Sequence, residues 1–457
     1  MPVISIVSGA ASALMIKSVL LAAPCEMVIE LPGNLGSEAM LGTSVALDGD
    51  LLAVGAPLET GAEWASGAVY VFRLEDGHWV NEAKLIADDA DWGDMLGVDV
   101  DLQGNTIIAG AWFNDAFGSN SGAAYVFTRS PSGVWSEPVK LVPPDPGAED
   151  VFGRTVALGD GFCAVGAPLD DDQGSSSGSI HVFDLKTDGS WIHSAKLVPL
   201  NAAEGHQLGL SLTADGLRIV GGSPWAHEGR GEIRLWNRLG SIWSSQWFMT
   251  MQSFGNPEDH FGFSVSLDGT RMAAGCYRDD TYGTDAGSAW VMEEVFDGWS
   301  MTKLAPPNPQ PGAQFGVSVT MSGENLMVGS RYATVNGVDS GQVDVLTAPS
   351  WSLANILSPP EPEADSEFGW ACDIQGDLAV VGALYQPEDG AVFAWSGMSS
   401  PCGCQGDFDG DGDVGVNDLL TVLEGWGSSD GVGDANGDGT TGIDDLLLII
   451  SIWGACP

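Results

Sequence analysis

Positive charge is scarce in this sequence. Its 457 residues include 16 Lys and Arg against 62 Asp and Glu, which gives a formal net charge of −46. Binding to a phosphate backbone or to an anionic membrane depends on Lys and Arg that neutralise the phosphates. The composition therefore argues against nucleic acid and anionic membranes as partners. The many carboxylates suit cation binding or simple solvation of the surface.

Long apolar runs are scarce too. After residue 24 none approaches the roughly 20 residues that a membrane-spanning helix needs, so we expect no transmembrane span. Residues 1–24 are small and apolar, with Lys17 as their one charge. Because an export signal carries its charge before the apolar run, we interpret residues 1–25 as an atypical export signal or a disordered N-terminus. We accordingly expect a secreted protein, extracellular or at the cell surface.

Recognisable catalytic motifs are missing as well. The sequence has no nucleophile elbow, P-loop, zinc-ligand spacing or dinucleotide fingerprint, and its six histidines show no paired metal spacing. Paired carboxylates abound, but among 62 acids they say little about catalysis. We therefore predict that the protein is not an enzyme and assign no catalytic residue.

Glycine, by contrast, is abundant and periodic. A pattern with its clearest copy at residues 152–168, FGRTVALGDGFCAVGAP, recurs seven times at intervals of 53 to 56 residues. A second glycine follows the first by 12 or 13 residues in every copy. The pairs are Gly42 and Gly55, Gly97 and Gly110, Gly153 and Gly166, Gly209 and Gly221, Gly262 and Gly275, Gly316 and Gly329, and Gly369 and Gly382. Seven copies in register indicate a repeat architecture.

Each unit contains four strand patterns. Two alternating strands are joined by a tight turn such as Asp48-Gly49, and a polar loop leads to two further strands. A tryptophan recurs once per unit, at 79, 135, 191, 243, 299 and 351, and is best explained as packing between sheets. Four antiparallel strands in each of seven units predict an all-β, seven-bladed β-propeller over residues 26–398. Polar loops such as 170–173 and 278–281 should gather on one face, either as a ligand or weak cation site or as solvated turns.

The ring should close through the N-terminus. The seventh unit lacks a fourth strand, and Val28-Ile29-Glu30-Leu31-Pro32 matches the fourth strands of other units, with Leu31 in the place of Leu85. Cys25 begins this strand, and Cys402 and Cys404 follow the strand with which it should pair. We therefore expect Cys25 to bond one of these two and Cys456 to bond the other. Cys163, Cys276 and Cys372 lie within predicted strands and should be buried free thiols.

The repeat resembles the FG-GAP repeat of integrin α-subunit propellers, and more closely its bacterial variant of the form FG-x-S-V-A-L…L-x-V-G-A-P…G-x-x-Y-V-F…W…K-L. Individual copies depart from it, since Leu replaces Phe before Gly42, Gly97 and Gly209. The resemblance implies a propeller that recognises a ligand or partner. Some integrin-type blades carry a calcium loop between their first two strands. Here those turns are short, so that calcium site is not expected.

The tail after a linker at 399–406 has a different composition. Residues 407–418 read DFDGDGDVGVND and residues 434–445 read DANGDGTTGIDD. Both have oxygen-bearing side chains at alternating positions, Gly at position 6 and Asp at position 12, as a twelve-residue calcium loop requires. The predicted Ca²⁺ ligands are Asp407, Asp409, Asp411, Asp413 and Asp418 in the first loop, and Asp434, Asn436, Asp438, Thr440 and Asp445 in the second. Folding of this module should therefore depend on two calcium ions.

Each loop leads into an apolar helix, expected at 418–426 and 444–453. Residues 407–457 thereby resemble a type I dockerin module, which implies attachment to a cohesin-like or other surface protein. Loop positions 10 and 11 often carry Ser-Thr in that family but are Val416-Asn417 and Ile443-Asp444 here, which argues against a cohesin itself. We expect the helices to pack on one another, with Leu419, Leu420, Val422 and Leu423 facing Leu446, Leu447, Ile450 and Trp453.

The sequence thus favours an exported, calcium-binding adhesion or scaffold protein. The propeller would bind a glycan or another extracellular ligand or partner, and the tail would attach it. The alternative is a component of polysaccharide degradation, either glycan-active or glycan-binding, because dockerins commonly tether such proteins.

Overall fold

A computed structural model describes most of the chain. The described residues are 25–29, 31, 35–36, 38–75, 77–253, 255–386, 389–398, 406, 408, 413–428, 432–433, 435, 440–451 and 453–455. All structural statements below refer to these residues.

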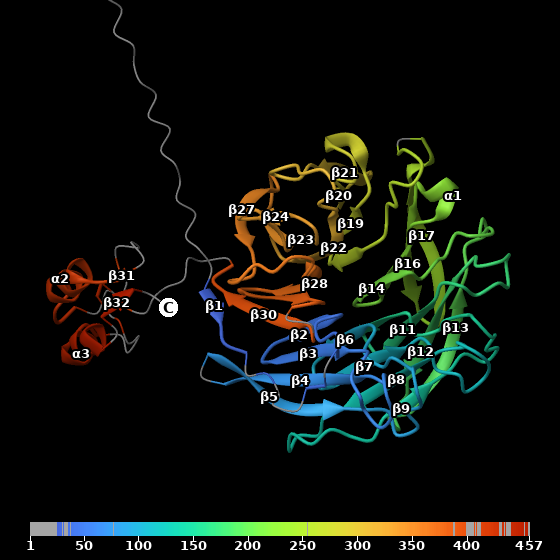
Figure 1. The fold of residues 1–457 in the computed structure, drawn as a ribbon, viewed down its shortest axis with the longest axis horizontal. Helices are drawn as coiled ribbons and strands as arrows, with labels where there is room; N and C mark the ends of the chain where they lie inside the picture. Colours follow the sequence, from blue (N-terminus) through green and yellow to red (C-terminus); the bar gives the residue numbers. More distant parts are fainter. Residues whose placement is uncertain are drawn as a thin grey trace, which may run out of the picture.

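Seven four-stranded antiparallel sheets, the blades, form a ring (Figure 1). Blades 1 to 3 contain β2 (Val45–Asp48), β3 (Leu51–Ala56), β4 (Ala68–Glu75) and β5 (His78–Leu85); β6 (Val100–Gln103), β7 (Thr106–Ala111), β8 (Ala123–Thr128) and β9 (Val139–Leu141); and β10 (Thr155–Gly159), β11 (Phe162–Ala167), β12 (Ser179–Leu185) and β13 (Trp191–Leu197). Blades 4 and 5 contain β14 (Ser211–Asp215), β15 (Arg218–Ser223), β16 (Glu232–Leu239) and β17 (Ile242–Thr250); and β18 (Val265–Asp268), β19 (Arg271–Cys276), β20 (Ser288–Val295) and β21 (Gly298–Leu304). Blades 6 and 7 contain β22 (Phe315–Ser322), β23 (Asn325–Ser330), β26 (Gln342–Thr347) and β27 (Ser352–Leu357); and β28 (Phe368–Gln375), β29 (Leu378–Ala383), β30 (Ala391–Ser396) and β1 (Cys25–Met27). The predicted seven-bladed propeller is confirmed.

Shorter elements decorate the loops between the strands. They are α1 (Ala226–Gly229), two 3₁₀ turns at Met251–Ser253 and Asp280–Tyr282, and the ribbon of β24 (Thr334–Val335) and β25 (Val338–Asp339). No described helix has the length and apolarity that crossing a membrane would require.

The paired glycines of the repeat lie where neighbouring blades touch. A Cβ at Gly55 of blade 1 would lie 2.0 Å from the carbonyl oxygen of Gly97 in blade 2, so no larger residue fits there. In blade 4 this position belongs to Gly222, whose added Cβ would meet the Gly262 carbonyl at 2.1 Å, and not to Gly221 as expected. The spacing from the first glycine is therefore 13 in every copy. The paired glycines of the repeat are therefore required by the close approach of neighbouring blades.

Blade 7 is closed by the N-terminal strand, as expected, because β1 pairs with β30 in antiparallel fashion (Figure 1). The register differs from the prediction by two residues. Met27 pairs with Ala394, which places Ile29 and not Leu31 in the position of Leu85. Ile29 packs in the core and Leu31 is exposed. A shift of two keeps the same face of the strand inward.

Tryptophans and cysteines follow the prediction closely. The six once-per-unit tryptophans each pack in or against an apolar cluster between sheets. Cys163, Cys276 and Cys372 are free, and Cys372 is only half-buried. The predicted disulfides, one between Cys25 and either Cys402 or Cys404 and one between Cys456 and the other of these two, involve cysteines outside the described residues.

The tail contains α2 (Val416–Glu424), α3 (Ile443–Ser451) and the two-residue strands β31 (Asp413–Val414) and β32 (Gly454–Ala455). Val422 and Ile449 are buried between the helices, and Leu419 and Leu446 pack partly against them. The predicted contact face is otherwise wrong, because five of its members are about half-exposed. They are Leu420, Leu423, Leu447, Ile450 and Trp453. With helices of nine residues each, only one narrow face of each can turn towards the other.

Candidate functional site

A buried ion pair recurs at the loop between the second and third strands of a blade. Lys84 of β5 lies 3.0 Å from Glu59, Lys196 of β13 lies 2.7 Å from Asp170, and Lys303 of β21 lies 2.5 Å from Asp279. All three carboxylates are nearly inaccessible to solvent. Each also accepts a hydroxyl hydrogen bond, from Tyr70, Ser179 and Ser288. These acids therefore hold the loop onto the outermost strand and are fully partnered inside the fold.

The ion pair depresses the pKa of the buried acid in blade 3. Burial alone would raise the pKa of Asp170, but the His181 ring 3.8 Å away, the Lys196 ammonium and the hydrogen bond from Ser179 outweigh it and hold that pKa well below its ordinary value. The Asp170 carboxylate is thus charged at neutral pH because the fold supplies cationic and polar donors.

In blade 4 the cation of the buried ion pair comes from a different residue. Phe248 stands where the outermost strands of blades 3 and 5 carry Lys196 and Lys303. The cation comes instead from Arg234 of β16, which lies 2.6 Å from Glu232 and contacts the Phe248 ring from 4.7 Å. The ion pair survives, but its cation comes from a different strand.

One group of described residues has the ligand types and spacing for a metal: Asp259, Cys276 and Asp279, all buried. Lys303 already places an ammonium 2.5 Å from Asp279. Burial raises the pKa of the Cys276 thiol well above its ordinary value, so the thiol stays protonated. The group therefore fits a lysine better than a metal ion.

The loops that the sequence analysis singled out are held by internal hydrogen bonds. Asp279 accepts the Thr281 N–H at 2.8 Å, and Asp280 accepts the Asp285 N–H at 2.8 Å. Asp172 pairs with Lys196 at 2.5 Å. These contacts favour the interpretation as structured turns over that as a weak cation site.

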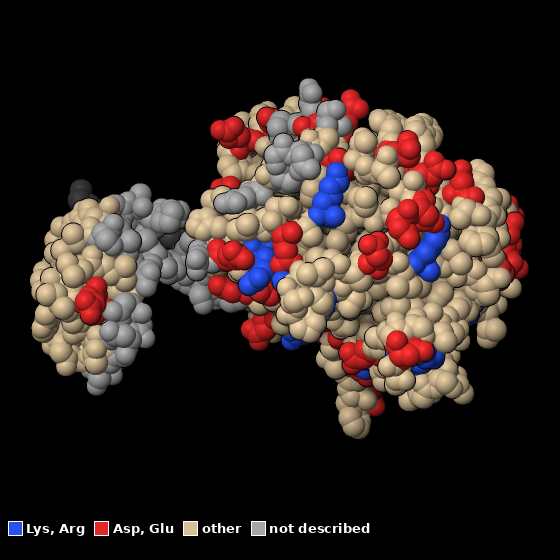
Figure 2. All heavy atoms as spheres, turned by 90° about the horizontal axis from the view of Figure 1, so that it is seen from below, with Lys and Arg blue, Asp and Glu red and all other residues tan. Residues whose placement is uncertain are grey.

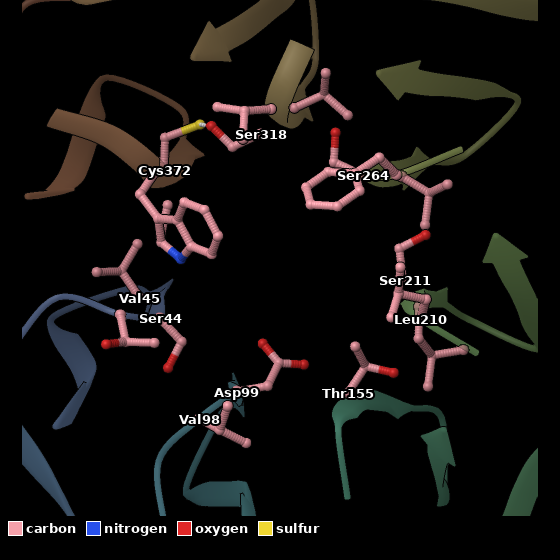
Figure 3. Close-up of a pocket in the computed structure, with 18 of the residues that line it drawn as sticks. Ser44, Val45, Val98, Asp99, Thr155, Leu210, Ser211, Ser264, Ser318 and Cys372 are labelled. Carbon is pink, nitrogen blue, oxygen red and sulfur yellow. Dashed lines mark hydrogen bonds between the residues drawn. The ribbon is translucent and has the colours of Figure 1, made fainter. Parts of the chain in front are cut away.

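A cavity of about 200 Å³ lies at the centre of the ring and is lined by all seven blades (Figure 3). Five of its lining residues are serines or threonines whose hydroxyls donate to a glycine carbonyl of the next blade at 2.7 to 3.0 Å. They are Ser44, Thr155, Ser211, Ser264 and Ser318. The equivalent positions hold Asp99 in blade 2 and Ala371 in blade 7. Figure 3 shows the Asp99 carboxylate directed towards the open centre.

Three aspartates on the inner strands have backbone partners. Asp99 and Asp101 accept the N–H groups of Val156 and Leu158 in blade 3 at 2.7 and 2.6 Å, and Asp373 accepts that of Leu47 in blade 1 at 2.8 Å. Burial raises the pKa of Asp99 and of Asp101 to about 7 and that of Asp373 to about 6, because these hydrogen bonds compensate desolvation only in part. These three aspartates therefore titrate near neutral pH.

The charged side chains on the outer surface are mostly acidic. Figure 2 shows Asp and Glu spread over this face, with the few Lys and Arg beside them. No single acidic patch stands out in this view, which agrees with carboxylates that serve solvation.

In the tail, the last acid of each predicted calcium loop has the same environment. Asp418 is buried and accepts the N–H groups of Phe408 and Gly415 at 2.6 and 2.7 Å. Asp445 is buried and accepts those of Ala435 and Gly442 at 2.9 and 2.6 Å. In both loops the donors are positions 2 and 9, so the two halves repeat one geometry.

The other predicted ligands are largely beyond what the structure describes. Asp407, Asp409, Asp411, Asp434, Asn436 and Asp438 fall outside the described residues, as does the side chain of Asp413. Thr440 is exposed. Position 7 contributes a backbone carbonyl in such loops, so an exposed Thr440 side chain is compatible with that role.

Fold and inner cavity together define a seven-bladed β-propeller protein with the N-terminal strand in its last blade. The family model described as "FG-GAP repeat" matches residues 32–72, 79–127, 135–183, 252–292, 299–345 and 351–395, more than half of the chain. The chain belongs to this repeat family. The unmatched repeat covers most of blade 4, where Arg234 replaces the usual lysine. A search of curated proteins found no match.

Sequence reasoning missed the inner ring. Its signal was present as departures from the repeat: Asp99 where most copies have Ser or Thr, and Arg154 directly after Gly153. The repeat does not require a particular side chain for packing at these two positions, so the residues there can serve binding instead.

Proposed function

We propose that this is an exported recognition protein, in which the propeller binds an extracellular ligand and the tail attaches the protein to a partner through a calcium-dependent module. The observation that carries the proposal is the duplicated tail geometry, in which Asp418 and Asp445 have equivalent buried positions and equivalent donors. Two chance acidic turns have no reason to share it. Membership of the FG-GAP repeat family supports a recognition role for the propeller.

The tail would hold one Ca²⁺ in each loop. The ligands would be the carboxylates and the amide oxygen at positions 1, 3 and 5, a carbonyl at position 7, and Asp418 or Asp445 at position 12. Calcium would neutralise the loop acids, which otherwise repel one another when the module folds. The described residues fit this role because both position-12 carboxylates are already fixed by hydrogen bonds.

An apolar stripe on each helix supports attachment. Val416, Leu420 and Leu423 on α2 recur as Ile443, Leu447 and Ile450 on α3, and all six are about half-exposed or more. Exposed apolar side chains that gather on one element mark protein interaction sites. The occupant we propose is a folded surface protein with an apolar patch of its own.

The calcium assignment is tested by titrating the full chain with calcium in a calorimeter. Two ions should bind, and Asp445→Asn should remove one of them, because a neutral amide is a poorer calcium ligand. Asp444→Asn, at an exposed neighbouring position, is the matched control and should keep both. Calcium should also raise the melting temperature of the tail, and chelator should reverse this. Absence of binding at millimolar calcium contradicts the assignment.

Attachment is tested with the double variant Leu420→Asp/Leu447→Asp. A partner identified by calcium-dependent capture should be lost with this variant and retained with Leu239→Asp, a change at an exposed leucine of blade 4. Equal capture by both variants would contradict the proposed face. Release of reducing ends from a polysaccharide panel would replace the recognition role by the enzymatic alternative.

A further inference from the structure

Arg154 differs from the other basic residues of the protein. Every other described Lys and Arg has an Asp or Glu carboxylate oxygen within 3.5 Å. Arg154 has no ion pair with any described residue. In a chain with a net charge of −46, carboxylates are available almost everywhere. An arginine without one is therefore a specific feature of its location.

That location is confined. Arg154 lines the central cavity and is half-buried. Its Cζ atom lies 5.0 Å from the ring centroid of Trp112, which is stacked on Phe113 at 4.3 Å. Burial lowers the pKa of Arg154, and the charge of Asp99 opposes this only in part. A partly desolvated cation without a direct anionic partner costs stability, so a ligand accounts for Arg154 better than the fold does.

The cavity around Arg154 has the chemistry of a small-ligand site. Phe263 and Trp370 contribute aromatic rings to its wall. The five inner hydroxyls each donate to a glycine carbonyl, so those of Ser44, Thr155, Ser211 and Ser264 keep their lone pairs to accept from a ligand, while that of Ser318 also lies 3.3 Å from the Cys372 Sγ. The volume of about 200 Å³ lies below the roughly 300–1,000 Å³ of drug-sized pockets. The cavity thus has room for one ring and not for an extended chain.

We propose that the central cavity binds a single carboxylated sugar residue, a uronic acid, whose carboxylate pairs with Arg154 and whose ring lies against Phe263 and Trp370. A guanidinium presents parallel N–H donors that match a carboxylate. The aromatic rings suit the C–H faces of a sugar, and the inner hydroxyls suit its hydroxyl groups. The inference names a ligand class for the propeller and rests on the proposed function only in taking the propeller as the recognising part.

The test compares the binding of galacturonate and galactose to the full chain by ligand-observed NMR and calorimetry. The two sugars differ only in a carboxylate against a hydroxymethyl group, so galacturonate should bind at least 10-fold more tightly, as expected for a charge-assisted hydrogen bond. Arg154→Gln should abolish that difference. Arg278→Gln removes an arginine that already pairs with Asp285 at 3.2 Å and should leave the affinity within about twofold.

Asp99→Asn provides a variant that gains binding. The amide oxygen can still accept the Val156 N–H, while the competing negative charge in the same cavity is gone. Galacturonate should then bind several-fold more tightly at pH 8. Circular dichroism and the melting temperature of each variant separate a lost site from a lost fold.

Three results would overturn the inference. They are galactose binding as tightly as galacturonate, Arg154→Gln behaving like Arg278→Gln, and a short acidic peptide binding more tightly than the sugar. The last result would assign the cavity to peptide carboxylates. Calcium-dependent capture through the tail is unaffected by all three, so the two proposals fail separately.

Discussion

Buried charges at the outer edges of the blades have oppositely charged partners, whereas those near the centre of the ring do not. At the edges, Lys84, Lys196 and Lys303 each meet a buried carboxylate directly. Towards the centre of the ring, Asp99 and Asp101 accept backbone N–H groups, Asp373 accepts a backbone N–H and the Thr320 hydroxyl, and the Arg154 guanidinium lies against the Trp112 ring. Complete pairs fasten loops to strands. Incompletely compensated charges weaken the fold locally and remain available to a ligand or a proton.

Removing the cation of an edge pair should have the largest effect. In Lys196→Met the carboxylate of Asp170 stays buried without its ammonium, and we expect the free energy of unfolding to fall by about 3–5 kcal/mol. Denaturant unfolding measures it. Lys186→Met removes a more exposed lysine and should cost less than about 1 kcal/mol. Adding Asp170→Asn to Lys196→Met should recover part of the loss, since no charge is then left buried alone. An equal loss of unfolding free energy in Lys196→Met and Lys186→Met would contradict the special role of the buried pair.

Neutralising an inner aspartate should have a smaller effect of opposite sign. Asp101 has a folded-state pKa of about 7, above the roughly 3.9 of an unfolded chain. Its protonation therefore stabilises the fold at low pH, and this contribution is lost as pH rises through 7. Asp101→Asn should raise stability at pH 8 by about 1 kcal/mol, a value reduced because the group is half-buried and screened. The stability of the variant between pH 5 and pH 8 should also vary less. A decrease at pH 8 contradicts the assignment.

Asp170, the edge acid of blade 3, should show the opposite pH dependence. The pKa of Asp170 is lowered in the fold, so its contribution is present above the ordinary pKa of an aspartate and is lost as pH falls below it. Asp170→Asn should therefore reduce stability at pH 7 but make it less sensitive to acid below pH 4. Unfolding curves at pH 7 and pH 3 measure both. A parallel loss at the two pH values would show that packing, and not charge, holds this loop.

Replacing Arg154 should have the smallest effect on stability. Because its guanidinium has no carboxylate partner among the described residues, Arg154→Gln should leave the melting temperature within about 2 °C or raise it slightly. Differential scanning calorimetry measures this. A fall as large as that of Lys196→Met would place Arg154 with the structural pairs of the blade edges.

Much of the architecture could be predicted because the same pattern of glycines and strands occurs in seven copies. Paired glycines and alternating strands placed blade 1 through blade 7, and the missing fourth strand of the last unit indicated closure by the N-terminus. The register at Ile29 was misplaced by two residues, because a two-residue slip leaves the inward face unchanged and the apolar pattern cannot detect it. The faces of α2 and α3 were misassigned for a related reason: apolar residues surround most of α3 and form a stripe on α2 that is wider than the face it buries, so periodicity does not say which of them are covered.

By itself the sequence determined the class of fold, the number of blades, the position of the seam and the two loops in which calcium is predicted, since these depend on local pattern and spacing. Only the tertiary structure decided which charges are paired. The carboxylate partners of a lysine come from loops up to 51 residues away, and the cavity draws its walls from all seven blades. Whether an acid or an arginine is compensated depends on distances across the ring, and no local pattern records them. For that reason Arg154 is one residue among sixteen cations in the sequence and a distinct one in the fold.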